Sequence, residues 1–169
     1  ILGDTGNITV DLLLDASTSQ LHRQETVAAQ GYMIAQSLTN CGIPVRMYSF
    51  CSLNGYTIMN LYRDYQETDR NRKIFDYFTA GANRDGLAIR LAAGMMKDNH
   101  AEHRILIVLS DCKPNDVIKV RTSTGQYKDY AASLGVEDTA AEVHKARMSG
   151  ITVLCVFTGE DDALPNVHR

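Results

Sequence analysis

Three nearly uninterrupted apolar runs constrain what this chain can fold into. Ile8–Leu14, Arg104–Ser110 and Ile151–Phe157 each have the length of a β-strand, and their apolar residues do not simply alternate with polar ones. Strands that are apolar on both faces are typical of parallel sheets covered by helices on both sides. The runs are far shorter than a membrane-spanning helix, so the sequence predicts no transmembrane segment.

Helical patterns separate these strands. Val45–Phe50 and Tyr56–Leu61 flank Asn54-Gly55, which predicts a hairpin whose second strand is an antiparallel edge. We therefore expect a Rossmann-like, doubly wound α/β fold: a three-layer α/β/α sandwich whose sheet is mostly parallel with one antiparallel edge strand. Apolar residues and end signals predict helices over Leu21–Asn40, Arg70–Phe78, Leu87–Met96 and Glu137–Ser149.

Composition indicates one globular domain and excludes some classes of binding partner. Of 169 residues, 44% are hydrophobic and 22% charged, with 17 Lys and Arg against 20 Asp and Glu, for a net charge of -3. No basic patch is large enough to attract a phosphate backbone or an anionic membrane, so we expect no nucleic-acid partner and no membrane insertion. The first residues carry neither an initiator Met nor a signal peptide. We expect residues 1–169 to be a single domain from the C-terminal part of a longer protein.

The four cysteines, Cys41, Cys51, Cys112 and Cys155, are far apart and lack the spacing of zinc or redox motifs. We interpret them as reduced core residues, which favours a cytoplasmic protein. The connection Cys112–Gly135 is predicted to be a loop, and loops of this length in compact domains are usually functional.

Hard oxygen donors follow two of the buried strands. Asp15, Ser17 and Ser19 form a D-x-S-x-S run after the first strand, and Asp111 follows the strand that ends at Ser110. Asn83 and Asp85 precede a predicted helix. Ligands of open α/β sheets bind outside the carboxyl ends of the strands, so these groups are expected to face one crevice. Carboxylate, hydroxyl and amide oxygens suit a hard divalent cation, with Mg²⁺ preferred to Mn²⁺ or Ca²⁺. The alternative is that Ser17, Thr18 or Ser19 only caps a helix.

At these residues the chain resembles von Willebrand factor type A (VWA) domains, whose metal-ion-dependent adhesion site contains D-x-S-x-S, a Thr before a helix and an Asp after the fourth strand. Asp15, Ser17, Ser19 and Asp111 match this pattern, and Asn83 stands where the Thr normally is. The resemblance implies strand order 3-2-1-4-5. It is strongest to the intracellular bacterial domains of the nitric oxide reductase activation protein NorD and the cobaltochelatase subunit CobT, through the stretches 83–86, 109–116 and 135–139.

The resemblance also implies a function. Such domains work as adaptors beside a MoxR-type AAA+ ATPase that activates or metallates a target enzyme. The cation would keep one position open for an Asp or Glu of the partner, and no histidine is placed to make the site an enzyme. The residues expected to form the partner-binding rim are Arg84, Asp85, Lys113, Asn115, Asp116 and Tyr127. Tyr127 and Tyr130 have a second interpretation, which we favour: they pack the long loop onto the domain.

A competing hypothesis is a haloacid-dehalogenase-type phosphohydrolase. Asp15 would be its nucleophile, Asp111 and Asp116 its metal ligands, and Lys113 its phosphate clamp. That chemistry needs a carboxylic acid two residues after the nucleophile, where this chain has Ser17. A serine hydroxyl cannot protonate the leaving group, which argues against this hypothesis.

Overall fold

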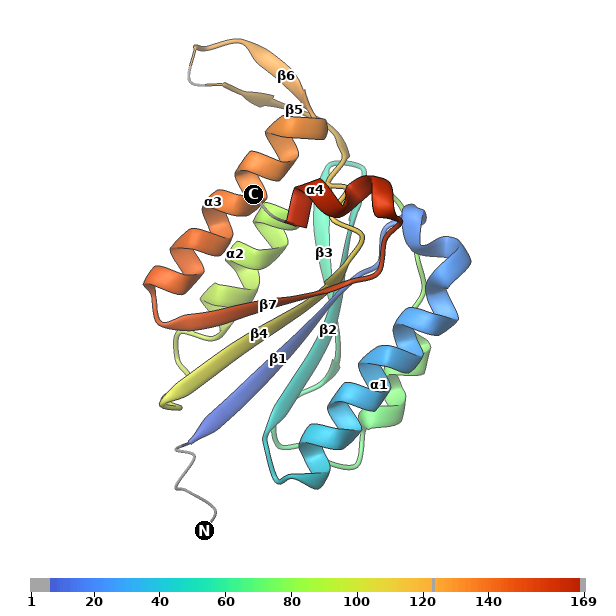
Figure 1. Ribbon diagram of the computed structural model, residues 1–169, viewed down its shortest axis with the longest axis vertical. Helices are drawn as coiled ribbons and strands as arrows, with labels where there is room; N and C mark the ends of the chain where they lie inside the picture. The colour runs from blue at the N-terminus through green and yellow to red at the C-terminus, as the bar shows by residue number, and fades with distance from the viewer. Residues whose placement is uncertain (1–6, 123, 168–169) are drawn as a thin grey trace.

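The central sheet has five strands in the order β3-β2-β1-β4-β7. The computed structural model in Figure 1 describes residues 7–122 and 124–167. Strands β1, β2, β4 and β7 are parallel, and β3 runs antiparallel to β2 at one edge. The expected fold class is therefore confirmed over the described residues. The strands of the sheet are β1 (Ile8–Asp15), β2 (Val45–Leu53), β3 (Tyr56–Arg63), β4 (His103–Ser110) and β7 (Ile151–Phe157).

The pairing of β1 with β4 positions the candidate site. Val10 lies opposite Ile105 and Leu14 opposite Leu109, so the two strands end at the same level. The expected strand order is thus confirmed. Because both strands point the same way, Asp15, the last residue of β1, and Asp111, which follows β4, meet at one edge of the sheet.

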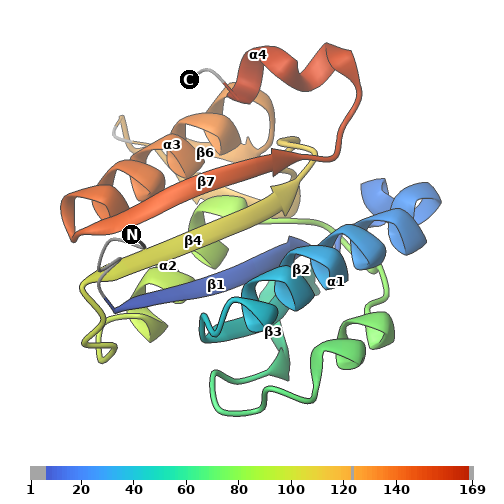
Figure 2. The ribbon, with the colours of Figure 1, turned by 60° about the horizontal axis from the view of Figure 1, so that its bottom comes forward.

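Helices cover both faces of the sheet, as Figure 2 shows. Alternate residues of β1 pack against the helices on opposite faces of the sheet: Leu12 and Leu14 pack towards α1, and Leu13 packs towards α2. Both sides of β1 are therefore buried, which is why its sequence is apolar without alternation. The helices are α1 (Gln24–Asn40) with the 3₁₀ helix η2 (Asn71–Asp76) on one face, and α2 (Asp85–Met95) with α3 (Ala132–Met148) on the other.

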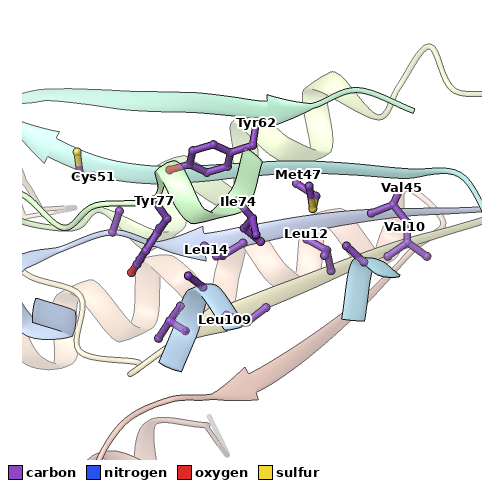
Figure 3. Packing of buried hydrophobic residues seen from close by; sticks show 14 residues of the cluster. Val10, Leu12, Leu14, Val45, Met47, Cys51, Tyr62, Ile74, Tyr77 and Leu109 are labelled. Carbon is purple, nitrogen blue, oxygen red and sulfur yellow. The ribbon is translucent and has the colours of Figure 1, made fainter. Parts of the chain in front are cut away.

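Figure 3 shows the core between β1, β2 and the α1 layer. Ile74 of η2 and Tyr77 close this cluster from outside, and both are buried. A side chain at Gly31 of α1 would lie 2.5 Å from Ile74 Cδ1, so the glycine allows η2 to approach the helix.

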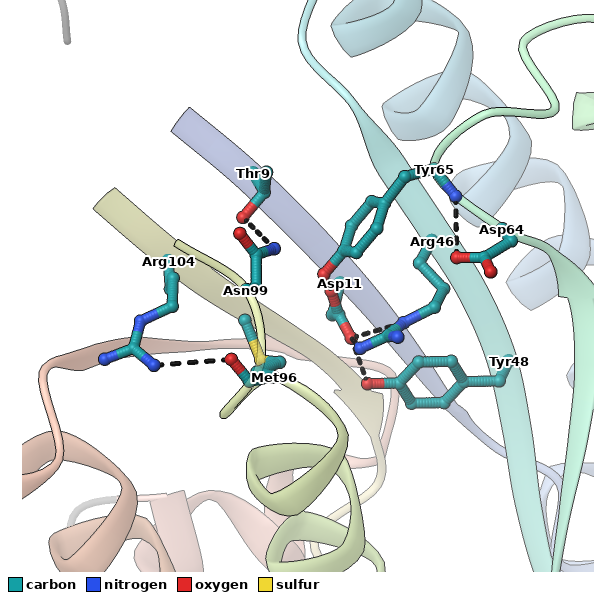
Figure 4. Close-up of polar contacts among 9 residues, drawn as sticks. All are labelled: Thr9, Asp11, Arg46, Tyr48, Asp64, Tyr65, Met96, Asn99 and Arg104. Carbon is teal, nitrogen blue, oxygen red and sulfur yellow. Dashed lines mark hydrogen bonds and ion pairs between the residues drawn. The ribbon is translucent and has the colours of Figure 1, made fainter. Parts of the chain in front are cut away.

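A second buried cluster is polar and surrounds Asp11, the charged residue that interrupts the apolar run of β1 (Figure 4). Arg46 donates to its carboxylate from Nε at 3.0 Å and from Nη2 at 2.7 Å. The hydroxyls of Tyr48 and Tyr65 donate to the same carboxylate, Tyr48 at 2.6 Å. The Arg46 guanidinium also lies over the Tyr65 ring. Asp11 is therefore buried with its charge fully compensated.

Several expected helix boundaries differ in the structure. The 3₁₀ helix η1 (Thr18–Arg23) precedes α1, and the segment expected as a helix over 70–78 is only the 3₁₀ helix η2. Helix α3 begins at Ala132 instead of near Glu137. Its first turn has few apolar residues, so hydrophobic spacing alone did not reveal the start. After β7 the chain forms the 3₁₀ helix η3 (Asp161–Ala163) and the short helix α4 (Leu164–Val167).

The prediction of a long loop over Cys112–Gly135 was wrong, because this segment contains a β-hairpin. Strands β5 (Asp116–Arg121) and β6 (Tyr127–Tyr130) pair antiparallel and project from the body beside α3 (Figure 1). Only Asp116 and Tyr130, at the base of the hairpin, are buried. A two-stranded ribbon without a buried face has no strong hydrophobic pattern, so the hairpin was not predicted from the sequence.

The interpretation of the cysteines as core residues was also wrong for three of them. Only Cys51 is buried, Cys112 is half-buried, and Cys41 and Cys155 are exposed, although all four are free thiols. No helix within residues 7–122 and 124–167 is long and apolar enough to span a membrane. Residues 1–6, 123, 168 and 169 lie outside the described part, so the expected domain of residues 1–169 is seen without them.

Candidate metal centre

Three carboxylates converge at the carboxyl edge of the sheet. Asp15 is the last residue of β1, Asp111 follows β4, and Asp85 is the first residue of α2. Their exposed fractions are 0%, 2% and 3%, respectively. Asp85 was expected both among the oxygen donors and on the partner-binding rim. The structure buries it in the crevice, at the start of α2.

A serine that the sequence analysis did not single out links two of these carboxylates. Ser110 Oγ lies 3.3 Å from Asp15 Oδ2 and 3.3 Å from Asp85 Oδ2. It also accepts a hydrogen bond from the backbone N–H of Cys112 at 3.0 Å. The D-x-S-x-S run holds the other side of Asp15, because the Ser17 N–H donates to Asp15 Oδ1 at 2.9 Å. The position of Ser110 at the end of β4, beside Asp111, was its only sequence signal.

The carboxylates have no cationic partner. Among residues 7–122 and 124–167, no Lys, Arg or His forms an ion pair with Asp15, Asp85 or Asp111. Burial, together with the nearby charge of Asp111, raises the pKa of Asp15 to about 6. Burial and the charges of Asp15 and Asp111 raise the pKa of Asp85 well above its ordinary value. Uncompensated negative charge of this kind favours a bound cation.

The two serine hydroxyls of the run face each other instead of capping a helix. Ser17 Oγ lies 2.9 Å from Ser19 Oγ, and Ser17 makes no side-chain cap bond to η1. Thr18 Oγ1 donates to the Gly81 carbonyl at 2.7 Å. The capping alternative is therefore not what the structure contains. Both serines border a cavity of about 460 Å³, whose other walls include Asn83, Pro114, Val136 and Asn166.

Asn83 lies in the site, but with a different orientation from the one expected. Its Oδ1 accepts the backbone N–H of Asn115 at 3.1 Å. Its Nδ2 therefore faces the carboxylates, 2.8 Å from Asp85 Oδ1 and 3.4 Å from Asp15 Oδ2. In this arrangement Asn83 donates to the carboxylates and offers no oxygen ligand to a cation. Asp85, two residues later, brings both carboxylate oxygens into the cluster, where Oδ1 accepts from Asn83 Nδ2 and Oδ2 from Ser110 Oγ.

The donor set fits a hard divalent cation only if groups other than carboxylates contribute. Among the described residues, no three His, Cys, Asp or Glu side chains are arranged to hold a metal by themselves. The serine hydroxyls at the cavity wall supply the kind of neutral oxygen that such a site needs. Mg²⁺ accepts few carboxylates and retains water, which matches this mixture better than zinc does.

The predicted rim is only partly exposed. Asp116 is buried, and its Oδ1 accepts a hydrogen bond from the backbone N–H of Val117 at 2.7 Å. Lys113 Nζ bonds Asp162 Oδ2 at 3.0 Å, so it is directed towards the segment after β7. Asn115 pairs with Asn83 through backbone hydrogen bonds.

The two tyrosines of the hairpin behave differently from each other. Tyr130 is buried, and its hydroxyl donates to Asp138 Oδ2 at 2.8 Å, as the packing interpretation expects. The guanidinium of Arg84 lies 5.1 Å above its ring. Tyr127 is 68% exposed, so the packing interpretation was wrong for it. It remains available to a partner.

Comparison with solved structures identifies the class of fold. The pilus adhesin SpaC of Lactobacillus rhamnosus GG aligns over 97% of this chain and 26% of its own, with TM-score 0.71 and 18% identity. The vWF domain of the pilus tip protein Mfa5 of Porphyromonas gingivalis aligns over 71% and 43%, with TM-score 0.56 and 16% identity. Manganese-loaded TRAP of Plasmodium vivax aligns over 96% and 63%, with TM-score 0.59 and 14% identity. The chain therefore has a VWA-like fold.

Two curated proteins are similar to this chain in sequence. Protein NorD of Stutzerimonas stutzeri is 27% identical over 158 residues, which is 89% of this chain and 24% of NorD. An uncharacterised protein of Pseudomonas aeruginosa, PA0525, is 25% identical over 135 residues, 78% of this chain and 20% of that protein. The chain thus spans at most a quarter of these relatives, and no protein-family profile matches it. Neither comparison favours the phosphohydrolase hypothesis.

Proposed function

We propose that this chain is a protein-binding module whose contact with its partner depends on a divalent cation. The observation that carries the proposal is a group of three buried carboxylates that pair with no Lys, Arg or His within residues 7–122 and 124–167, beside two serine hydroxyls at a cavity. The residues that would hold the cation are Asp15, Ser17, Ser19 and Asp111, with Asp85 in place of the Asn83 amide. Mg²⁺ is the expected ion, and the manganese-loaded TRAP neighbour supports a divalent ion in this fold.

When bound, the cation would supply an electrophilic position for one carboxylate from outside the chain. The chain's own residues prepare that position. Ser110 and the Ser17 N–H orient the Asp15 carboxylate, and the Asn83 amide orients Asp85. A proton on Asp85, which its raised pKa favours, would leave two negative charges to balance a divalent ion. The site would then retain attraction for an Asp or Glu of the partner.

The partner we propose is a MoxR-type AAA+ ATPase, a target metalloenzyme, or both, and the chain would act as an adaptor in the cytoplasm. The NorD relative supports this proposal. The exposed hairpin residue Tyr127 and the basic side chains Lys119, Arg121 and Lys128 would help to select the partner. The adaptor would bind without catalysing a reaction.

Calorimetric titration of the chain with Mg²⁺, Mn²⁺ and Ca²⁺ tests the cation site. We expect saturable heat for at least one ion, and at least about tenfold weaker binding by Ser17→Ala, because a buried hydroxyl ligand is lost. The matched control is Ser133→Ala, which removes an exposed hydroxyl of α3 and should leave binding unchanged. No heat at millimolar concentrations of any ion would contradict the proposal.

Affinity capture with an identified ATPase subunit tests the adaptor role. Capture should require the divalent cation, stop on addition of a chelator, and be lost in Ser17→Ala. In parallel, the chain is incubated with phosphate esters and Mg²⁺. Phosphatase turnover that Asp15→Asn abolishes would overturn the adaptor proposal in favour of the phosphohydrolase.

A further inference from the structure

Two free thiols lie side by side next to the candidate metal centre. The Sγ atoms of Cys112 and Cys155 are 3.8 Å apart, although the residues are 43 positions apart in the sequence. Cys155 belongs to β7, where it is opposite Val108 of β4, and Cys112 follows β4 by two residues. Cys155 is exposed and Cys112 half-buried, so both can be reached from solvent.

The backbone of Cys112 is unusual and is connected to the site. Its φ is 56°, a left-handed conformation that favours glycine and is costly for most other residues. Its N–H donates to Ser110 Oγ, the hydroxyl between Asp15 and Asp85, and its carbonyl accepts from Asn166 Nδ2 of α4 at 2.9 Å. A cysteine in this strained position thus holds its thiol against a second thiol while its backbone contacts the carboxylate cluster.

We propose that Cys112 and Cys155 are a modification site at which a peroxide forms a reversible disulfide that weakens the cation site. The regulatory part rests on the proposed function. In the reaction, one thiol sulfur attacks a peroxide oxygen, the O–O bond breaks, and a sulfenic acid and water form. The second thiol then attacks the sulfenic sulfur, which forms the S–S bond and releases a second water. Two thiols and one H₂O₂ thus give one disulfide and two waters.

The geometry suits this reaction. The sulfur atoms need to approach by less than about 2 Å to reach the ~2.05 Å of a disulfide. Cys155 is the first nucleophile, because it is the more exposed thiol. A hydrogen bond from the Cys112 thiol also lowers the pKa of Cys155. A thiol of the cell's reducing systems would reverse the reaction by exchange.

Closing the disulfide would move the residues that shape the site. Cys112 is adjacent to Asp111, and the Lys113 N–H donates to Asp111 Oδ1 at 3.1 Å. A shift of Cys112 towards β7 therefore changes the positions of both Asp111 and Ser110. Because these groups surround the candidate cation position, we expect the oxidised chain to bind the cation more weakly.

Thiol counting after oxidation tests the modification site. The reduced chain is treated with a small excess of H₂O₂, quenched, unfolded and labelled with N-ethylmaleimide for intact-mass measurement. Four thiols are labelled before oxidation. We expect two labels afterwards, on Cys41 and Cys51, and four again after treatment with dithiothreitol. Cys155→Ser should form no disulfide, whereas the control Cys41→Ser should form it as readily as the natural chain. Four labels after oxidation, or a disulfide in Cys155→Ser, would overturn the proposal.

Titration of both forms with Mn²⁺ tests the effect on the site. We expect at least about fivefold weaker binding by the oxidised chain, and no effect of peroxide on binding by Cys155→Ser. Equal affinity of the two forms would refute the regulatory effect. Absence of heat from the reduced chain would instead contradict the proposed function, and the label count would still decide whether the disulfide forms.

Discussion

Asp85 shows how one side chain changes the electrostatics of the candidate site. It adds a third buried carboxylate beside Asp15 and Asp111, and burial together with the neighbouring carboxylate charges raises the pKa of Asp15 and of Asp85. In the absence of a cation, this repulsion opposes folding near neutral pH. A bound divalent ion would reduce the penalty, because its charge offsets that of the ionised carboxylates.

We therefore expect Asp85→Asn to stabilise the cation-free chain and to weaken its response to the cation. The gain is expected at pH 7.5, because the substitution removes a buried charge that burial and the charges of Asp15 and Asp111 disfavour. Thermal melts with and without Mn²⁺ measure both effects. Asp98→Asn, at an exposed position after α2, is the control and should change neither. A destabilised variant with an undiminished Mn²⁺ response would contradict the assignment of Asp85 to the site.

Asp11 is the opposite case, a buried carboxylate whose charge is fully compensated by Arg46, Tyr48 and Tyr65 (Figure 4). We expect Asp11→Asn to lower the free energy of unfolding by about 3 kcal/mol, because the buried guanidinium loses its partner. Urea unfolding measures the change. The control is Asp76→Asn, which breaks the exposed pair with Lys73 and should cost less than about 1 kcal/mol. Equal effects of the two substitutions would contradict this prediction.

At the level of elements, the β5–β6 hairpin is separable from the core. Its base residues Asp116 and Tyr130 are buried, whereas Val117 and Tyr127 are largely exposed. We expect replacement of residues 117–129 by a short Gly-Ser linker to preserve the fold and cation binding while abolishing capture of the partner. Circular dichroism, Mn²⁺ titration and affinity capture measure the three properties. Capture that survives the replacement would exclude the hairpin from the partner interface.

For the whole molecule, the raised pKa of Asp15 links stability to pH. The pKa is about 6 in the folded chain, compared with an ordinary value of 3.8. Between these values the folded chain binds more protons than the unfolded chain, so this group's contribution to stability is lost as pH rises from about 4 to above 6. The same ionisation prepares the site for a cation.

The melting temperature of the cation-free chain should therefore fall more steeply from pH 5 to pH 7.5 than that of Asp15→Asn. For the natural chain, the increase caused by Mn²⁺ should be larger at pH 7.5 than at pH 5. Melts of both proteins at both pH values provide the comparison. Identical pH dependence in the two proteins would show that Asp15 does not titrate in this range.

The sequence alone determined the architecture, because the apolar residues of each strand indicate which of its faces are buried. The apolar runs of β1, β4 and β7 indicate burial on both faces, and Asn54-Gly55 indicates the turn to the edge strand: both adopt the positive φ that a tight hairpin needs. The fold class and strand order follow from these local signals and the VWA resemblance. The ends of β1 and β4 also predicted where Asp15, Ser17, Ser19 and Asp111 would meet.

Only the tertiary structure decided which groups face one another in the candidate site. The Asn83 amide turns its nitrogen towards the carboxylates because its oxygen accepts a hydrogen bond from the backbone N–H of Asn115, which is 32 residues away. Asp85 and Ser110 enter the site because α2 begins, and β4 ends, at the same edge of the sheet. The two thiols of Cys112 and Cys155 meet only because β7 pairs with β4. Local patterns record whether a residue is buried, but not which distant residue it contacts, since chain packing sets those distances.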